Sequence, residues 1–170
     1  MPSGTGEGKR PVNSQVEAYR TDVREIAEAY GIGEYEDLIL AVIMQESSGM
    51  GTDVMASSES GFNTRYDSTP GSIEDPRYSI ECGVQTLKIA MERACVQSPR
   101  DMDRIALALQ GYNFGINGYL DYVWKNEIRS WSRETAEEYA KMASGEVLRG
   151  EDNPFAETAG PWDYGDQRYP

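Results

Sequence analysis

The sequence contains no histidine and only two cysteines, and these shortages exclude several kinds of active site. Without histidine there is no Ser-His or Cys-His nucleophile pair and no histidine-ligated metal. Carboxylates are therefore the main candidates for acid–base chemistry, and we expect neither a metal nor a cofactor. Cys82 and Cys95 fall on one predicted helix, about 20 Å apart, so they cannot form a disulfide with each other. The helical period places Cys95 near the buried stripe and Cys82 opposite it.

Long hydrophobic runs and an excess of positive charge are also missing. No apolar run approaches the roughly 18–20 residues that a membrane helix needs, so the sequence predicts no membrane-spanning helix. The net charge of −13 argues against a protein that binds nucleic acid through its phosphates. Residues 1–13 have no apolar signal core and are interpreted as a flexible leader. The remaining residues, 14–170, are long enough for one domain with a sizeable core.

Hydrophobic periodicity predicts a mainly helical domain. Ser14–Glu17 fits a capping box that starts a first helix, which ends at Gly31. A second helix is predicted from about Glu34, and its seven consecutive apolar residues, Leu38–Met44, indicate that it is central and buried on all sides. A buried parallel strand is the alternative for this run, but no alternation of strands and helices surrounds it. Further helices are predicted from Asp75-Pro76 to about Cys95, from Asp101 to about Tyr112, in the aromatic segment after Gly115, and after Ser132.

Two segments lack a helical pattern. Residues 47–75 are rich in Gly, Ser, Thr, Asp and Asn, and unstructured connections of that length are often functional. We expect this segment to be irregular or to contain a short β-hairpin. The tail from Gly150 is rich in Pro, Gly, Asp and aromatic residues and is expected to pack as irregular chain.

Glu46 stands at the end of the most hydrophobic segment, in "AVIMQESSG". On a helix it shares a face with Ile39, Val42 and Ile43, close to the negative end of the helix dipole. Desolvation and the dipole both disfavour the charged form and would raise the pKa of Glu46, as a general acid near neutral pH requires. The alternative is a helix-ending glutamate that turns outward or is satisfied by a nearby donor.

The loop after Glu46 supplies further carboxylates, Asp53 and Glu59. Its glycines and short hydroxyl side chains suit a tight turn beside an open cleft. An acid of raised pKa plus a second carboxylate is the usual requirement for cleavage of a glycosidic bond. Taken alone, a carboxylate in such a loop is more often simply solvated, so neither residue by itself indicates a site.

Three motifs, "MQESSG", "MASSES" and "ALQGYNFG", occur in that order and together resemble the CwlT-type lysozyme-like domain. Such domains occur in cell-wall hydrolases of conjugative elements and phages, within the superfamily of goose-type lysozymes and soluble lytic transglycosylases. The similarity runs from about Ala18 to the "YGDQRY" near the C-terminus. It implies a mainly α, lysozyme-like α+β fold, in which helices surround a buried central helix and the long loop forms one wall of a cleft.

The resemblance also implies roles for individual residues. Glu46 matches the catalytic acid that protonates the glycosidic oxygen of peptidoglycan, and Glu59 falls where a second acidic residue is often found. Tyr112 and Asn113 match the residues that line the cleft near the acid. Ala56 departs from the pattern, because the family usually has glutamine there. Further candidate sugar contacts are Gln45, Ser57 and Gln110, although Gln45 and Gln110 are equally compatible with structural roles.

The predicted function is an N-acetylmuramidase that cleaves the β-1,4 bond between N-acetylmuramic acid and N-acetylglucosamine. A lytic transglycosylase, which needs no second carboxylate, is the alternative, and an acidic non-catalytic binding module remains open. The expected partner is peptidoglycan, with no nucleic acid, and the expected chain is a monomer at the outer, cell-wall face of a bacterium. Because the chain is so acidic, we expect a membrane tether or a fused peptidase domain to supply localisation.

Overall fold

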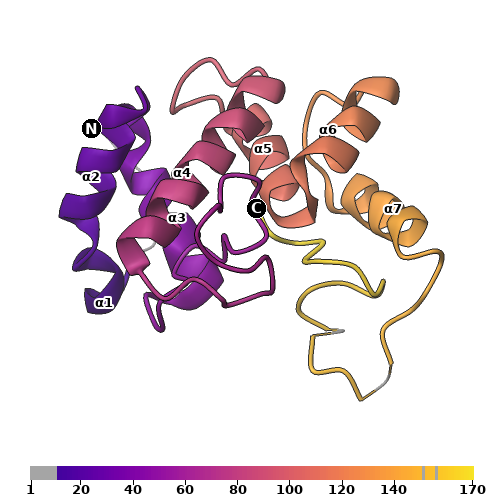
Figure 1. Ribbon diagram of the computed structural model, residues 1–170. Coiled ribbons are helices and arrows are strands. Elements are labelled where there is room, and N and C mark those ends of the chain that lie inside the picture. Colours follow the sequence, from indigo (N-terminus) through magenta and orange to yellow (C-terminus); the bar gives the residue numbers. More distant parts are fainter. Residues whose placement is uncertain (1–10, 151, 156) are drawn as a thin grey trace, which may run out of the picture. The chain divides into compact units, whose positions relative to one another are not determined.

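The computed structural model describes residues 11–150, 152–155 and 157–170 (Figure 1). The predicted leader therefore lies outside the described residues except for its last three positions. The chain divides into two compact units, Met1–Gln85 and Thr86–Pro170, which are described separately below. The described residues are mainly helical, as predicted, and none of their helices is long and apolar enough to cross a membrane.

The first unit is built around one apolar helix. Its elements are α1 (Ser14–Glu17), α2 (Arg20–Ala29), the 3₁₀ helix η1 (Gly33–Tyr35), α3 (Glu36–Ser47) and the first half of α4 (Pro76–Arg93). The α3 helix contacts α1, α2 and η1. The apolar run is therefore helical, as predicted, and does not form the alternative buried strand.

The first predicted helix is in fact two. The chain leaves the α-helix after Glu17 and resumes it at Arg20, with Tyr19 N–H donating to the Val16 carbonyl at 3.0 Å in a tighter turn. The cap is also one residue earlier than predicted, because Asn13 Oδ1 accepts a hydrogen bond from Val16 N–H at 2.8 Å. Asparagine is one of the preferred N-cap residues. It was overlooked because it lies one position before the S-x-x-E pattern.

The α3 helix is not buried on all sides. Ile39, Leu40, Val42 and Ile43 are buried, but Asp37, Ala41 and Gln45 are exposed. These three positions are spaced by four residues and form one solvent-facing stripe. An exposed alanine side chain costs little free energy because it is small. The solvent-facing stripe was therefore not visible in the uniformly apolar sequence.

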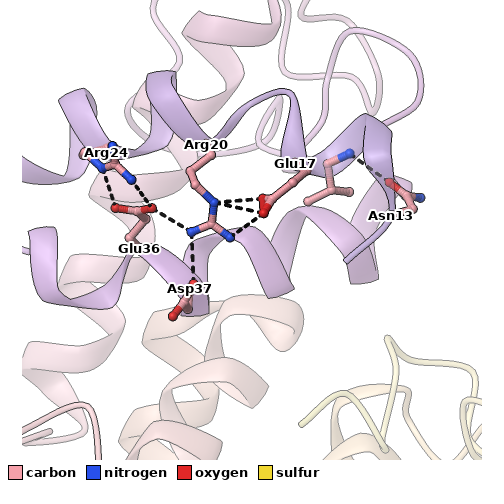
Figure 2. A network of polar contacts seen from close by, with 7 residues as sticks. Asn13, Glu17, Arg20, Arg24, Glu36 and Asp37 are labelled. Atoms are coloured by element: carbon pink, nitrogen blue, oxygen red, sulfur yellow. Dashed lines mark hydrogen bonds and ion pairs between the residues drawn. The ribbon is translucent and has the colours of Figure 1, made fainter. Parts of the chain in front are cut away.

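Charged residues hold the start of α3 against α2 (Figure 2). Arg20 pairs with Glu36 at 2.7 Å, with Asp37 at 3.1 Å and with Glu17 at 2.8 Å. Arg24 reaches the same Glu36 carboxylate at 2.9 Å. Hydrogen bonds from Arg24 and Arg20 lower the pKa of Glu36, so this carboxylate stays ionised at neutral pH.

The segment between α3 and α4 forms turns, and its described residues contain no strand, so the irregular option is confirmed and the hairpin is not formed. Side chains bind backbone groups in place of a sheet. Thr52 Oγ1 donates to the Ile73 carbonyl at 2.7 Å, and Asn63 Nδ2 donates to the Ser58 carbonyl at 2.8 Å. Tyr78 Oη accepts a hydrogen bond from Thr64 N–H at 2.9 Å.

The second unit packs around a cluster of aromatic rings. Its helices are the second half of α4, then α5 (Met102–Phe114), α6 (Ile116–Lys125) and α7 (Arg133–Ala143). Ring centroids lie 5.2–5.9 Å apart among Phe114, Tyr119, Tyr122, Tyr139 and Tyr164. Burial raises the pKa of Tyr139 to about 12, so the cluster is uncharged at neutral pH. The described residues of the tail are irregular, as expected, and Trp162 forms an antiparallel bridge with Leu148.

The two cysteines form no disulfide with each other, as predicted, but the predicted burial was wrong for both. Cys82 is fully buried and packs in a small cluster with Ile73 and Tyr78. Burial raises the pKa of the Cys82 thiol, which makes it a poor nucleophile. Cys95 is exposed because α4 ends at Arg93 and Cys95 adopts a left-handed conformation with φ of 58°. The helical period used for the prediction does not extend to this residue.

Replacing Gly83 by alanine is expected to displace the loop residue Met55. A Cβ at Gly83 would lie 2.7 Å from Met55 Cβ and 2.5 Å from its sulfur, and the Cβ cannot move without the backbone. Overpacking costs about 1–3 kcal/mol, against a gain of about 1 kcal/mol in helix propensity. We therefore expect the free energy of unfolding in urea to fall by up to about 2 kcal/mol, in place of the gain of about 1 kcal/mol that helix propensity alone would give.

The matched control is Gly61→Ala, where an added Cβ meets nothing within 4 Å. The control should unfold like the wild type. A Gly83→Ala variant more stable than the wild type by about 1 kcal/mol, the full gain in helix propensity, would show that Met55 is not held in this position.

Candidate active site

Glu46 lies in the last turn of α3, half-buried, on the face that carries the buried Ile39, Val42 and Ile43. The helix ends because Ser48 takes a left-handed conformation with φ of 55°, and Ser48 N–H donates to the Met44 carbonyl at 3.1 Å. The apolar sequence thus brings one carboxylate to the end of a hydrophobic helix.

Hydrogen bonds from both sides fix the turn after Glu46. Ser47 Oγ donates to the Val54 carbonyl at 2.8 Å, which links the helix end to the following loop. Asn13 Nδ2 donates to the Ser48 carbonyl at 2.9 Å. Gly49 packs directly on α1, since a Cβ there would lie 2.8 Å from Val16 N. The backbone that carries Glu46 is therefore held by residues from two segments, the start of α1 and the loop at Val54.

Asp53 organises the loop that leads to Glu59. One carboxylate oxygen, Oδ1, accepts from Ser79 Oγ at 2.7 Å and from Ser57 N–H at 2.9 Å. The other, Oδ2, accepts from Ser58 N–H at 3.1 Å and from Ser58 Oγ at 2.5 Å. Two adjacent loop residues and one helix residue thus converge on a single side chain.

The hydrogen bonds also decide the charge of Asp53. Burial opposes ionisation, but the bonds from Ser58, Ser79 and Ser57 favour the carboxylate and together lower the pKa of Asp53. The residue is therefore an anion with its hydrogen-bonding capacity taken up inside the loop. Both oxygens of its carboxylate thus support the loop and its attachment to α4.

The two predicted site residues of the loop, Ser57 and Glu59, have different environments. Ser57 is buried, and its Oγ donates to the Ser79 carbonyl at 2.8 Å, so the hydroxyl is engaged within the protein. Glu59 is exposed and follows directly on the anchored Ser58. Ala56 is exposed and has a positive φ of 47°.

The predicted sugar contacts of the second unit lie on α5. Gln110 is fully buried, with its Nε2 donating to the Asp166 carbonyl at 2.8 Å and its Oε1 accepting from Trp131 Nε1 at 3.0 Å. Asn113 is half-buried, and its Oδ1 accepts from Asp166 N–H at 2.7 Å. Tyr112 is half-buried as well. Gln110 and Asn113 therefore bind the C-terminal segment to α5, and contact between any of these residues and sugar stays a prediction.

Sequence reasoning missed Ser79, Asn63 and Tyr78, which hold the loop from outside the "MASSES" motif. Ser79 and Tyr78 lie on α4, and in the sequence they are indistinguishable from ordinary helix residues. Asn63 was detectable as a turn former, but its partners were not. Among the residues that the structure describes, no group of His, Cys, Asp or Glu could hold a metal ion.

Comparison with known proteins places this arrangement in a family. The lysozyme-like family matches residues 13–166, which include α3, the Asp53 loop and α5. The chain belongs to the lysozyme-like family. The CwlT-type resemblance is confirmed by 36% identity over 126 residues to the bifunctional muramidase/DL-endopeptidase CwlT of Bacillus subtilis. The match covers 72% of this lysozyme-like chain and 34% of CwlT.

Two further relatives extend over more of the chain. The membrane protein YocA of Bacillus subtilis is 33% identical over 159 residues, covering 89% of this chain and 63% of YocA. The crystal structure of a lipoprotein-like NLP/P60-family protein from Staphylococcus aureus superimposes with a TM-score of 0.73 at 32% identity. That superposition covers 93% of this chain and 50% of the other. The lysozyme-like chain thus spans from a third to two thirds of the length of these relatives.

Proposed function

We propose that this chain is a cell-wall lytic enzyme, an N-acetylmuramidase that cleaves the β-1,4 bond between N-acetylmuramic acid and N-acetylglucosamine. The observation that carries the proposal is Glu46, a half-buried carboxylate at the end of the apolar helix α3 in a lysozyme-like chain. A relative at 36% identity is a muramidase by name, which supports the same class of reaction. An apolar face and a fixed backbone suit a group that must hold a proton until the glycosidic oxygen accepts it.

In the proposed mechanism Glu46 donates its proton to the glycosidic oxygen as the bond to the anomeric carbon breaks. The transition state resembles an oxocarbenium ion, and a second carboxylate can stabilise it or orient the attacking water. Glu59 is proposed for this role, because it is exposed and its backbone follows directly on the Ser58 that Asp53 anchors. Water then adds to the anomeric carbon and leaves a reducing end.

Mass spectrometry of digested peptidoglycan tests the proposed reaction. Hydrolysis adds one water to each cleaved bond, so the products should carry reducing N-acetylmuramic acid. A lytic transglycosylase instead forms a 1,6-anhydro ring from the C6 hydroxyl, and its products are lighter by one water. Exclusively anhydro products would contradict the muramidase assignment and the role of Glu59.

The proposed site of action is the outer, cell-wall face of a bacterium, with peptidoglycan strands as the partner. Several relatives are longer than this chain, and one of them, CwlT, is named as a DL-endopeptidase as well as a muramidase. We propose that a companion domain or membrane tether supplies localisation. A net charge of −13 gives electrostatic repulsion from anionic wall polymers, so charge does not favour association with the wall.

A further inference from the structure

A pocket of about 360 Å³ lies in the second unit, between α5 and the turn that follows α6. It is lined by Arg104, Leu107, Trp124, Glu127, Ile128 and Arg129. None of these residues belongs to the motifs that carry the proposed catalysis. Its volume is at the lower end of the range for ligand pockets and corresponds to a few amino-acid residues.

The end of α6 creates one wall of this pocket. Glu127 adopts a left-handed conformation with φ of 53°, and Ile128 N–H donates back to the Val123 carbonyl at 3.0 Å. This C-cap reverses the chain and brings Ile128 and Arg129 to the side of α5 that carries Leu107.

Trp124 is held in place although it is exposed. Its indole Nε1 donates to the Arg93 carbonyl at 2.9 Å, while 45% of the residue remains accessible. A large aromatic surface that is fixed and exposed loses little conformational entropy when a ligand packs on it. Together with Leu107 and Ile128 it gives the pocket an apolar side.

Ion pairs within the protein offset the positive charges of Arg104 and Arg129 only weakly. Arg104 Nε is 3.8 Å from Asp101, a long ion pair, and its Nη1 reaches the Ala94 carbonyl at 3.4 Å. Arg129 is exposed and forms no ion pair with any described residue. Two guanidinium groups in one pocket repel each other, and an anion between them would relieve that repulsion.

A third charged residue in the lining restricts which ligands the pocket can bind. Glu127 also lines the pocket, and a carboxylate there disfavours a polyanion such as a phosphate polymer. It suits a ligand that carries an amine near its carboxylate. A small aliphatic side chain would fit the surface of Leu107 and Ile128.

We propose that this pocket binds the carboxyl end of a short peptide, namely a stem peptide of peptidoglycan. Arg104 and Arg129 hold the terminal carboxylate, Trp124 and the aliphatic pair cover the methyl groups of terminal alanines, and Glu127 faces the amine of a diamino acid. The identity of the peptide as a wall peptide rests on the proposed function, whereas the carboxylate site does not.

The test is a two-dimensional NMR titration of the full chain with the free peptide L-Ala-γ-D-Glu-L-Lys-D-Ala-D-Ala. The Trp124 indole signal, assigned with a Trp124→Phe variant, should shift and saturate with a dissociation constant of about 1 mM or lower. The double variant Arg104→Gln/Arg129→Gln should weaken binding at least about tenfold, because it removes two charge-assisted hydrogen bonds. The matched control is Arg133→Gln, an exposed arginine of α7 that pairs with Glu137 at 2.8 Å and should leave the affinity unchanged.

A second arm depends on no variant. Amidation of the terminal carboxylate of the peptide should weaken binding by the wild type as much as the double variant does. Absence of a shift up to about 10 mM peptide, or equal binding of the amidated peptide, would overturn the proposal. Tighter binding of glycerol phosphate than of the peptide would overturn it too, because the site would then recognise phosphate.

Two measurements separate this proposal from the proposed function. Glu46→Gln should bind the peptide like the wild type, and Arg104→Gln/Arg129→Gln should cleave peptide-free glycan strands at the wild-type rate. A chain that binds the peptide but cuts no glycan refutes the muramidase alone. A chain that cuts peptide-free glycan but ignores the peptide refutes the pocket alone.

Discussion

Replacing Glu46 by glutamine is expected to lower the rate of glycan-strand cleavage by about 10²–10⁴-fold, the usual contribution of a general acid. Glutamine has nearly the same shape and can still form hydrogen bonds, but it has no proton to give to the leaving oxygen. The measurement is the release of soluble muropeptides from purified peptidoglycan, together with a urea unfolding curve of the variant. The unfolding curve should stay close to that of the wild type.

The control for this substitution is Glu74→Gln, an exposed carboxylate in the same long segment. The substitution replaces the same chemical group by the same amide, away from the proposed site, and should leave the rate unchanged. A Glu46→Gln variant that retains wild-type activity would refute the catalytic assignment and favour a binding module. A variant that loses activity only because it unfolds would appear at once in the urea curve.

Replacing Asp53 by alanine is expected to lower the free energy of unfolding by about 2–4 kcal/mol. The substitution removes the common acceptor of Ser57, Ser58 and Ser79 and leaves their buried donors without it. Hydrogen bonds to charged acceptors are worth about 1.5–3 kcal/mol each, but their effects at one side chain do not add fully. Urea denaturation of the wild type and variant measures the difference directly, and Asp67→Ala, at an exposed aspartate of the same segment, serves as the control.

The contribution of Asp53 should also depend on pH in a defined direction. Its pKa is lower in the folded chain than in the unfolded one, so the stabilisation is present above about pH 4 and is lost as the pH falls through the folded value. The stability difference between the wild type and Asp53→Asn should therefore shrink on acidification below about pH 4. A difference that is constant from pH 7 to pH 2 would mean that Asp53 acts through packing and not through its charge.

The helices were predictable because each depends on neighbours in the sequence. The period of apolar residues located α4 and α5, and Ser132 was recognisable as the start of α7 from its position alone. The same reasoning failed where a contact with a distant part of the sequence decides which residue caps a helix. Asn13 replaces Ser14 as a cap while its amide also binds Ser48, thirty-five residues away.

The position of Glu46 at the end of a largely buried helix was predictable, whereas the hydrogen bonds of the following loop were not. An acid after an apolar run is visible in the sequence, and the structure confirms the buried neighbours on its face. The loop depends on pairs such as Asp53 with Ser79 and Ser58 with Ile73, which no periodicity reveals. Gln110 shows the reverse problem: it was predicted as a possible sugar contact, but its side chain is fully buried and forms hydrogen bonds with Trp131 and Asp166.

The two ends of α3 are attached by forces that respond differently to salt. At the first turn, Arg20 and Arg24 hold Glu36 through partly exposed ion pairs, which dissolved ions screen. At the last turn the attachment is the Asn13–Ser48 hydrogen bond and the close contact of Gly49 with α1, neither of which involves a charge. Rising ionic strength should therefore loosen α3 from its first turn onward, while the turn that carries Glu46 keeps its anchor. The position of the Glu46 carboxyl group should therefore depend less on ionic strength than the packing of the first turn of α3 does.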